Sequence, residues 1–423
     1  MVMSQVRLRR AFGMALFLAA IAWAVSPPAS AQVQYQFQIL HSFGSPGDGA
    51  GPDGGLVFDQ EGDLYGVTAT DSAGGFGKVF ELTPGADGQW TETILHSFSG
   101  GTTDGYDPAG VAIDKSGNLY GTTTYGGLND LGTIFELSPA GGGQWNETIL
   151  WNCSSADCAL PLFPPTLGPK SILYGITTRS VYSLAQGSNG WAFSVLYAFC
   201  SLPNCADGSD ALGSPTFDAK ANLYGVTQDG GTGGGINCSL GCGVVFVLHP
   251  EPTFPWKETV LYDFQYPDSG VTGGATLRGG KLYGTTGGGG GGCECGTVYE
   301  LAQGSGGSIE EQVIHGFTTG SQGITPWRAV EFDPLGDLFG VTLYGGNLDF
   351  CGVGCGAVYG MKQERNGNWG FAVLHDFTYS DGEEPDAPLT VDTKGNLFGI
   401  TTAGGPYQGG VVFELSPTAQ ASK

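Results

Sequence analysis

Three features of the sequence predict an all-β fold, a seven-bladed β-propeller. A motif of the form Leu-aromatic-Gly-x-Thr occurs seven times at intervals of 50 to 59 residues, as is typical of repeat proteins. Each interval holds four short apolar stretches, and repeated four-stranded units form propellers. The repeat is also incomplete at both ends of the chain. The motif begins at Leu64, Leu119, Leu173, Leu223, Leu282, Leu338 and Leu397.

The second repeat shows the predicted strands most clearly. Residues 110–114, 118–124, 132–138 and 145–151 are short β patterns, and turns or Gly-rich loops separate them. We name these strands A to D, from the propeller axis outward. The A–B turns are tight, whereas the B–C and D–A connections are long and variable. The third repeat is degenerate, with a poor strand A near 165–168.

The chain ends predict how the ring closes. A lone D strand at 37–43 opens the mature chain, while the last repeat stops after its C strand at 411–415. We expect the first strand to complete the last blade, because closure removes free sheet edges. This arrangement makes 32–423 a single propeller domain.

Two positions of the motif indicate packing inside each blade. The repeated glycine leaves room for an aromatic side chain from an adjacent strand or blade. The repeated threonine, two residues later, fits a ladder of hydroxyl groups. Both are interpreted as structural.

The N-terminus has the pattern of a secretory signal peptide over 1–31. A basic stretch with Arg7, Arg9 and Arg10 precedes an apolar run from Ala11 to Val25, and cleavage is expected near Ala31. No run is long enough for a membrane span in the mature chain. We therefore expect a secreted or periplasmic protein. Loss of the three arginines takes the net charge from −24 to −27, which argues against binding to nucleic acid.

The ten cysteines form five close pairs, all in predicted D–A or B–C loops. An even number in a secreted chain predicts disulfides, here one inside each loop. Zinc ligation is the alternative, but the spacings vary between the pairs. The pairs are Cys153 with Cys158, Cys200 with Cys205, Cys238 with Cys242, Cys293 with Cys295, and Cys351 with Cys355.

The composite repeat resembles a known family. Its parts are Leu-His-x-Phe, Asp-Gly-x-x-Pro, Gly-Leu-x-x-Asp, Gly-Asn-Leu-Tyr-Gly-Thr-Thr, and Gly-Thr-x-Phe-x-Leu, and they are clearest at 94–138 and 373–417. The pattern is similar to the GloVer-type tandem repeat of secreted bacterial proteins over nearly the whole mature chain. This resemblance implies a secreted or surface protein and supplies no reaction.

We expect a binding site on the face formed by the B–C and D–A loops, near the mouth of the channel. The carboxylates of the repeated Asp-Gly-x-x-Pro motif could hold Ca²⁺ around the channel, although Asp-Gly is also ordinary turn chemistry. The candidate contacts are Asp104, Asp107, Tyr125, Asp207, Asp229, Trp327, Arg328, Tyr344 and Asp381.

Other repeated positions favour structure over catalysis. His41, His96, His315 and His375 share one place on strand D, where other repeats have Tyr or Trp, which indicates packing. The favoured function is a monomeric, non-catalytic binding or scaffold module for a glycan or a surface protein. An extracytoplasmic lyase or hydrolase acting at the channel mouth is the main alternative, and a purely structural surface protein is the third.

Overall fold

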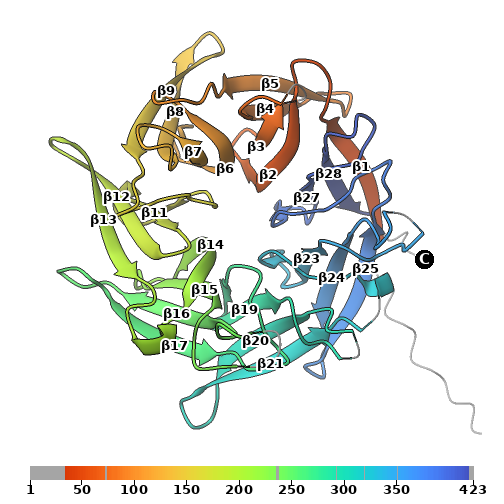
Figure 1. The fold of residues 1–423 in the computed structure, drawn as a ribbon. Helices are drawn as coiled ribbons and strands as arrows, with labels where there is room; N and C mark the ends of the chain where they lie inside the picture. Colours follow the sequence, from red (N-terminus) through yellow and green to blue (C-terminus); the bar gives the residue numbers. More distant parts are fainter. Residues whose placement is uncertain are drawn as a thin grey trace, which may run out of the picture.

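Seven four-stranded antiparallel sheets form a closed ring around a central channel (Figure 1). The structure is a computed structural model that describes residues 34–71, 74–234, 238–291, 293–318, 320–349 and 351–418. The predicted signal peptide, 1–31, lies outside these residues. The all-β, seven-bladed propeller expected from the repeat is confirmed.

Each blade contains strands A to D in order from the channel outward. The A strands are β2 (Gly49–Phe58), β6 (Gly105–Ile113), β10 (Thr166–Leu167), β14 (Ser209–Phe217), β18 (Thr276–Arg278), β22 (Glu331–Phe332) and β26 (Thr390–Val391). The B strands are β3 (Leu64–Asp71), β7 (Leu119–Gly126), β11 (Leu173–Ile176), β15 (Leu223–Asp229), β19 (Lys281–Thr286), β23 (Leu338–Thr342) and β27 (Leu397–Thr401).

Strands C and D form the outer half of each blade. The C strands are β4 (Lys78–Pro84), β8 (Thr133–Gly141), β12 (Ser180–Gly187), β16 (Val244–His249), β20 (Thr297–Gln303), β24 (Ala357–Gln363) and β28 (Val411–Pro417). The D strands are β5 (Trp90–Ser97), β9 (Gln144–Asn152), β13 (Gly190–Ala198), β17 (Lys257–Asp263), β21 (Ile309–Gly316), β25 (Trp369–Asp376) and β1 (Tyr35–Ser42). Short 3₁₀ turns occur at η1 (Pro169–Ser171), η2 (Pro203–Cys205) and η3 (Gly320–Gln322).

The ring closes through its first strand. β1 pairs antiparallel with β28, so that Phe37 lies opposite Leu415 and Ser42 opposite Val411. The last blade, blade 7, therefore consists of β26, β27, β28 and β1, whereas blades 1 to 6 follow the chain. The expected closure is confirmed.

The inner strands differ from the prediction in length. β2, β6 and β14 begin several residues early, because the Asp-Gly-x-x-Pro segment pairs with strand B instead of forming a loop. In β2, for example, Gly49 lies opposite Asp71 and Pro52 opposite Thr68. A long B–C hairpin extends the ladder in these blades, so the motif is part of the wall of the propeller.

The repeated glycine has the predicted packing role. A Cβ atom on Gly121 would collide with the ring of Phe135, which belongs to the neighbouring strand C and is fully buried. The same relation holds for Gly66 with Phe80 and for Gly399 with Phe413. Glycine thus lets a large ring lie flat across strand B, where it fills the space beside the next blade.

The repeated threonines do not form the expected ladder. Thr123 is fully buried, but its hydroxyl donates to the carbonyl oxygen of Tyr125 at 2.9 Å and accepts the backbone N–H of Thr133 at 3.1 Å. Thr227 makes the same kind of bonds in its own blade. Thr401 does the same in blade 7, so in these blades the hydroxyl joins the start and end of a B–C loop. The hydroxyls of Thr68 and Thr342 are instead buried without a hydrogen-bond partner among the residues that the structure describes.

Candidate functional site

The five predicted disulfides are all present, each inside one loop. Two lie in D–A loops, at Cys153–Cys158 and Cys200–Cys205. Three lie in B–C loops, at Cys238–Cys242, Cys293–Cys295 and Cys351–Cys355. The disulfides fit an extracellular or periplasmic protein. They stiffen the face of the propeller on which binding residues were expected.

A cavity of about 290 Å³ lies in the central channel. Its walls are residues of the inner A strands and of the segments that lead into them. Phe163, Pro164, Leu277 and Pro388 give the lining an apolar part. The charged part consists of Asp53, Arg328, Glu331 and Asp386.

Arg328 is the charged centre of this cavity. Its Nε donates to Oδ1 of Asp386 at 2.7 Å and to the carbonyl oxygen of the same residue at 3.1 Å. The guanidinium carbon lies 5.8 Å from the centre of the Phe163 ring. The side chain is held by Nε on one side and by an aromatic face on the other. Within the part of the chain that the structure describes, its remaining N–H groups have no hydrogen-bond partner and could donate to a ligand.

Two further acidic groups in the cavity have raised pKa values. Burial raises the pKa of Asp53, although Arg328 partly offsets the effect, and Asp53 Oδ1 accepts the backbone N–H of Gly54 at 2.6 Å. Burial raises the pKa of Glu331 to about 7. The cavity therefore offers a permanent cation, a paired carboxylate and two carboxyl groups that hold protons more tightly than usual.

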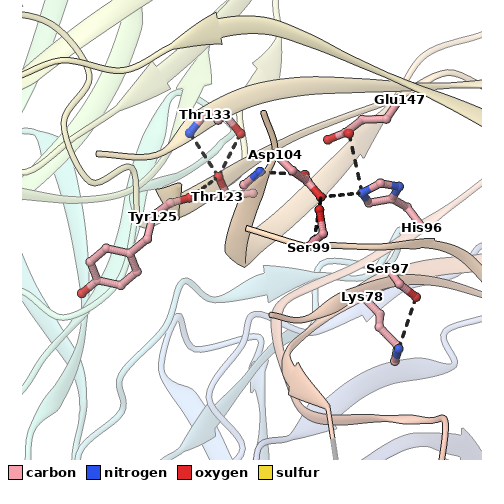
Figure 2. A network of polar contacts seen from close by, with 10 residues as sticks. Lys78, His96, Ser97, Ser99, Asp104, Thr123, Tyr125, Thr133 and Glu147 are labelled. Carbon is pink, nitrogen blue, oxygen red and sulfur yellow. Dashed lines mark hydrogen bonds and ion pairs between the residues drawn. The ribbon is translucent and has the colours of Figure 1, made fainter. Parts of the chain in front are cut away.

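The predicted site residue Asp104 lies elsewhere, in a polar cluster between blades 1 and 2. Figure 2 shows His96 of β5 between Asp104 and Glu147 of β9. The Nε2 atom of His96 is 3.7 Å from Oδ2 of Asp104 and 3.6 Å from Oε2 of Glu147. Asp104 also accepts the backbone N–H of Ser99 at 2.6 Å.

A β-bulge positions the histidine. In the pairing of β4 with β5, Val79 lies opposite His96 and Phe80 opposite Ile94, so Leu95 is the extra residue. The bulge changes which face the strand presents, and it lets Leu95 be buried while the next side chain, His96, points toward the following blade. β1 repeats the arrangement at Leu40 and His41.

The pKa values of this cluster follow from its packing. Burial alone would raise the pKa of Asp104, but bonds from His96 and Ser99 lower it below the usual value. Burial raises the pKa of Glu147 to about 7, against the opposing effect of His96. The two carboxyl groups thus differ in their affinity for a proton.

Asp207 and Asp381 occupy equivalent places in other blades. The Tyr197 hydroxyl donates a hydrogen bond to Oδ2 of Asp207 at 2.9 Å, and Nε2 of His375 lies 3.3 Å from Oδ2 of Asp381. These aspartates bond to outer D strands, so the repeated motif places its carboxylates in an outer ring rather than around the channel. This position does not match the arrangement considered for Ca²⁺ in the channel.

The remaining predicted contacts are dispersed. Tyr125 stacks on Tyr106 with ring centres 5.2 Å apart, and Asp229 ends β15. Burial raises the pKa of Asp107, and Asp107 in turn slightly raises the pKa of Asp53. Burial raises the pKa of Tyr344, and Glu384 and Asp386 raise it further. Trp327 is half-buried directly before Arg328. Of the nine predicted contacts, only Arg328 lines the channel cavity.

A second cavity, of about 790 Å³, lies among the disulfide-bearing loops around blade 3. It is lined by Arg179, Asp157, Cys200 and Asp210, among others. The degenerate B–C connection of blade 3 is too short to fill this space. The cavity supports the expectation that the loop face is the adaptable side of the propeller.

Sequence reasoning missed Asp53, Glu331 and Asp386. The available signal was a departure from the repeat: Asp53 and Asp386 each follow the proline of the motif, where blade 2 has Ala109. Arg328 is one of the predicted contacts, but its neighbours Asp386 and Asp53 come from blades 7 and 1. Their convergence depends on closure of the ring.

A family model described as the Gloeobacter/Verrucomicrobia repeat matches residues 29–238 and again 235–423. The chain belongs to this family. The match confirms the resemblance seen in the composite motif and covers all seven blades of this Gloeobacter/Verrucomicrobia repeat protein. Comparison with curated proteins gives no match.

Solved structures similar to this repeat protein share its fold. The extracellular domain of a candidate one-component system from B. thetaiotaomicron has a TM-score of 0.50 at 12% identity, and the match covers 90% of this chain and 39% of that one. An aldose sugar dehydrogenase from Streptomyces coelicolor scores 0.42 at 12% identity, with 91% and 99% covered. A Trichoderma reesei enzyme of carbohydrate-active family AA12 scores 0.44 at 10% identity, with 91% and 96% covered.

These identities show the fold alone. The chain spans well under half of the first of these proteins. Within the residues that the structure describes, no helix of this repeat protein is long and apolar enough to cross a membrane.

Proposed function

We propose that this protein is an extracytoplasmic, non-catalytic module that binds a carbohydrate in the central channel, after removal of a signal peptide near Ala31. The observation that carries the proposal is the position of Arg328. It lies in a small cavity, paired with Asp386 and close to Asp53. Polar groups that converge in a concave, partly apolar site are the usual mark of a small-molecule site.

The chemistry of the lining favours a sugar over other small ligands. Free N–H groups of Arg328 can donate to hydroxyl oxygens, while the carboxyl oxygens of Asp53 and Asp386 can accept hydroxyl protons. Phe163 and Leu277 offer apolar surface to the C–H faces of a sugar ring. The overall net charge of −24 disfavours a polyanionic ligand.

The cavity volume limits the size of the ligand. At about 290 Å³, it lies at the lower end of the range for small-molecule sites, roughly 300–1,000 Å³. We therefore infer that the channel accepts the end of a glycan, with the rest of the chain passing over the loop face. A protein partner would instead contact the loops and would not depend on Arg328.

A glycan array probed with residues 32–423, with and without Ca²⁺, tests this proposal. Replacement of Arg328 by Met keeps the apolar stem and removes the charge. Because charge-assisted hydrogen bonds contribute about 1.5–3 kcal/mol, we expect affinity for the best array ligand to fall at least about tenfold. Lys394→Ala, in an exposed A–B turn, is the matched control. Equal affinity in wild type and Arg328→Met would refute the proposal.

A hydrolase or lyase acting at the same cavity is the second candidate. Asp53 and Glu331 both have raised pKa values because of burial, and a general acid must retain its proton near neutral pH. Incubating the bound saccharide with wild type and with Glu331→Gln, followed by product analysis, separates the two functions. Cleavage by wild type that is lost in Glu331→Gln would favour the enzyme.

A further inference from the structure

The junction between blades 7 and 1 brings three metal-ligating side chains together, away from the channel. His41 comes from β1, Asp48 from the following D–A loop, and Glu92 from β5. The Nε2 atom of His41 is 3.3 Å from Oδ2 of Asp48 and 3.7 Å from Oε2 of Glu92. The next junction repeats this cluster with His96, Asp104 and Glu147.

At other junctions between blades, different side chains occupy the position of this cluster. At two of them a tyrosine hydroxyl donates to a carboxylate: Tyr197 to Asp207 at 2.9 Å, and Tyr262 to Glu311 at 2.8 Å. Such a hydroxyl satisfies the carboxylate directly.

At two more junctions a phenylalanine replaces the glutamate. His375 then stacks on Phe37 with ring centres 3.9 Å apart, and His315 stacks on Phe371 at 3.8 Å. Those histidines serve as packing groups, as the sequence suggested. In the described part of the chain, the combination of one imidazole and two carboxylates occurs at the His41 and His96 junctions.

These two clusters contain buried oxygen and nitrogen atoms that are free to act as metal ligands. Oε1 of Glu92 and Oε1 of Glu147 are buried and have no hydrogen-bond partner among the described residues. Nε2 of His96 is also buried, and its contacts with the two carboxylates, at 3.6 and 3.7 Å, are longer than hydrogen bonds. Buried polar atoms without partners are costly, and a bound ion is one explanation for them. Asp48 is meanwhile held in place, because its Oδ1 accepts the backbone N–H of Gly49 at 2.7 Å.

The distances suit a tetrahedral ion. Ligand bonds of about 2.0–2.1 Å, as for zinc, place tetrahedral donor atoms about 3.3 Å apart. The measured separations of 3.3 and 3.7 Å around His41 are close to this edge length. An imidazole with two carboxylates matches a divalent transition metal better than Ca²⁺, which prefers oxygen ligands alone.

A fourth coordination position is available at the first cluster. A cavity of about 570 Å³ lies against His41, Asp48 and Glu92, and Tyr407 is among the other residues that line it. At the second cluster, Oδ2 of Asp104 already accepts two bonds from Ser99, at 2.6 and 2.8 Å. The second cluster has less free bonding capacity and is therefore the weaker site.

We propose that His41, Asp48 and Glu92 form a divalent transition-metal site at the closure of the propeller, and that His96, Asp104 and Glu147 form a weaker copy one blade further on. The ion at the first site links β1, the N-terminal strand that closes the ring, to β5 of blade 1. Metal bound by groups that meet only in the folded chain stabilises the fold.

Zn²⁺ and Co²⁺ titrations of metal-free residues 32–423 test the proposal. We expect two Zn²⁺ sites by calorimetry, visible absorption bands of four-coordinate Co²⁺, and a rise in Tm with Zn²⁺. Glu92→Gln should remove the tighter site, and Glu147→Gln the weaker one. Glu311→Gln, at a tyrosine junction, is the matched control and should keep both.

Circular dichroism of each variant, together with its Tm without metal, distinguishes loss of a site from loss of the fold. The proposal is overturned if the folded wild type binds no stoichiometric Zn²⁺ at 100 times the protein concentration. It is also overturned if the folded double variant Glu92→Gln, Glu147→Gln binds as wild type does.

Discussion

Single residues decide how closely the strands of a blade can pack. Strand B requires a glycine because an aromatic ring from strand C lies against its backbone, in the space that a Cβ atom would occupy. The hydroxyl of Thr123, two residues further on, forms hydrogen bonds with both ends of one B–C loop. The repeat motif thus encodes two local constraints: the contact between glycine and ring recurs in every blade, and the threonine bonds occur in some of them.

Replacement of Gly121 by Ala tests this packing. The added methyl would collide with the Phe135 ring, and overpacking of a core costs about 1–3 kcal/mol. We expect the free energy of unfolding, measured with urea, to fall by that amount. Adding Phe135→Leu should recover part of the loss, so the two changes should be non-additive. Strictly additive losses would argue against contact between these side chains.

The pKa of Glu258 gives stability a defined pH dependence. Burial, with a contribution from Asp207, raises the pKa of Glu258 from 4.5 to about 7. Between those values the folded chain holds a proton that the unfolded chain has released, so stability falls as pH rises. Glu258→Gln removes the titration, and its Tm relative to wild type should increase from pH 5 to pH 8. A constant difference across this range would contradict the raised pKa.

At the scale of elements, the sequence predicted strands more accurately than connections. The four-strand unit, the closing strand and the five local disulfides were all predicted, because each depends on a local pattern. The Asp-Gly-x-x-Pro segment was expected in a loop but extends strand A in several blades. Long B–C hairpins supply its pairing partners, and hairpin length cannot be judged from the motif itself.

The disulfides offer a test of how loops contribute to stability. Cys200 and Cys205 are five residues apart, and closure of so short a loop is worth about 2 kcal/mol in the chain-entropy model. We expect Cys200→Ser, Cys205→Ser to lower the free energy of unfolding by about 2 kcal/mol or less and to keep the fold.

The Cys153–Cys158 pair provides the comparison. Both of these residues are fully buried, so the same replacement also removes packing and should cost more. If the less buried Cys200–Cys205 pair proved the more costly to remove, the disulfides would do more than stiffen loops.

At the scale of the whole molecule, ring closure creates sites that no single repeat contains. Arg328 and Asp386 are 58 residues apart, and Asp53 joins them from the opposite end of the chain. The sequence predicted Arg328 as a contact, but its partners could not be found, because sequence spacing does not say which inner strands face each other across a channel. The predicted carboxylates of Asp104 and Asp381 lie instead beside histidines of the outer D strands.

The most direct test of channel binding is a crystal structure of residues 32–423 with the best saccharide from the array. We predict sugar density in the central cavity, with hydroxyl groups within hydrogen-bonding distance of the Arg328 guanidinium and of the Asp53 or Asp386 carboxyl oxygens. Density found instead over the disulfide loops of blade 3, or on the A–B face with the channel empty, would contradict the assignment of the channel as the binding site.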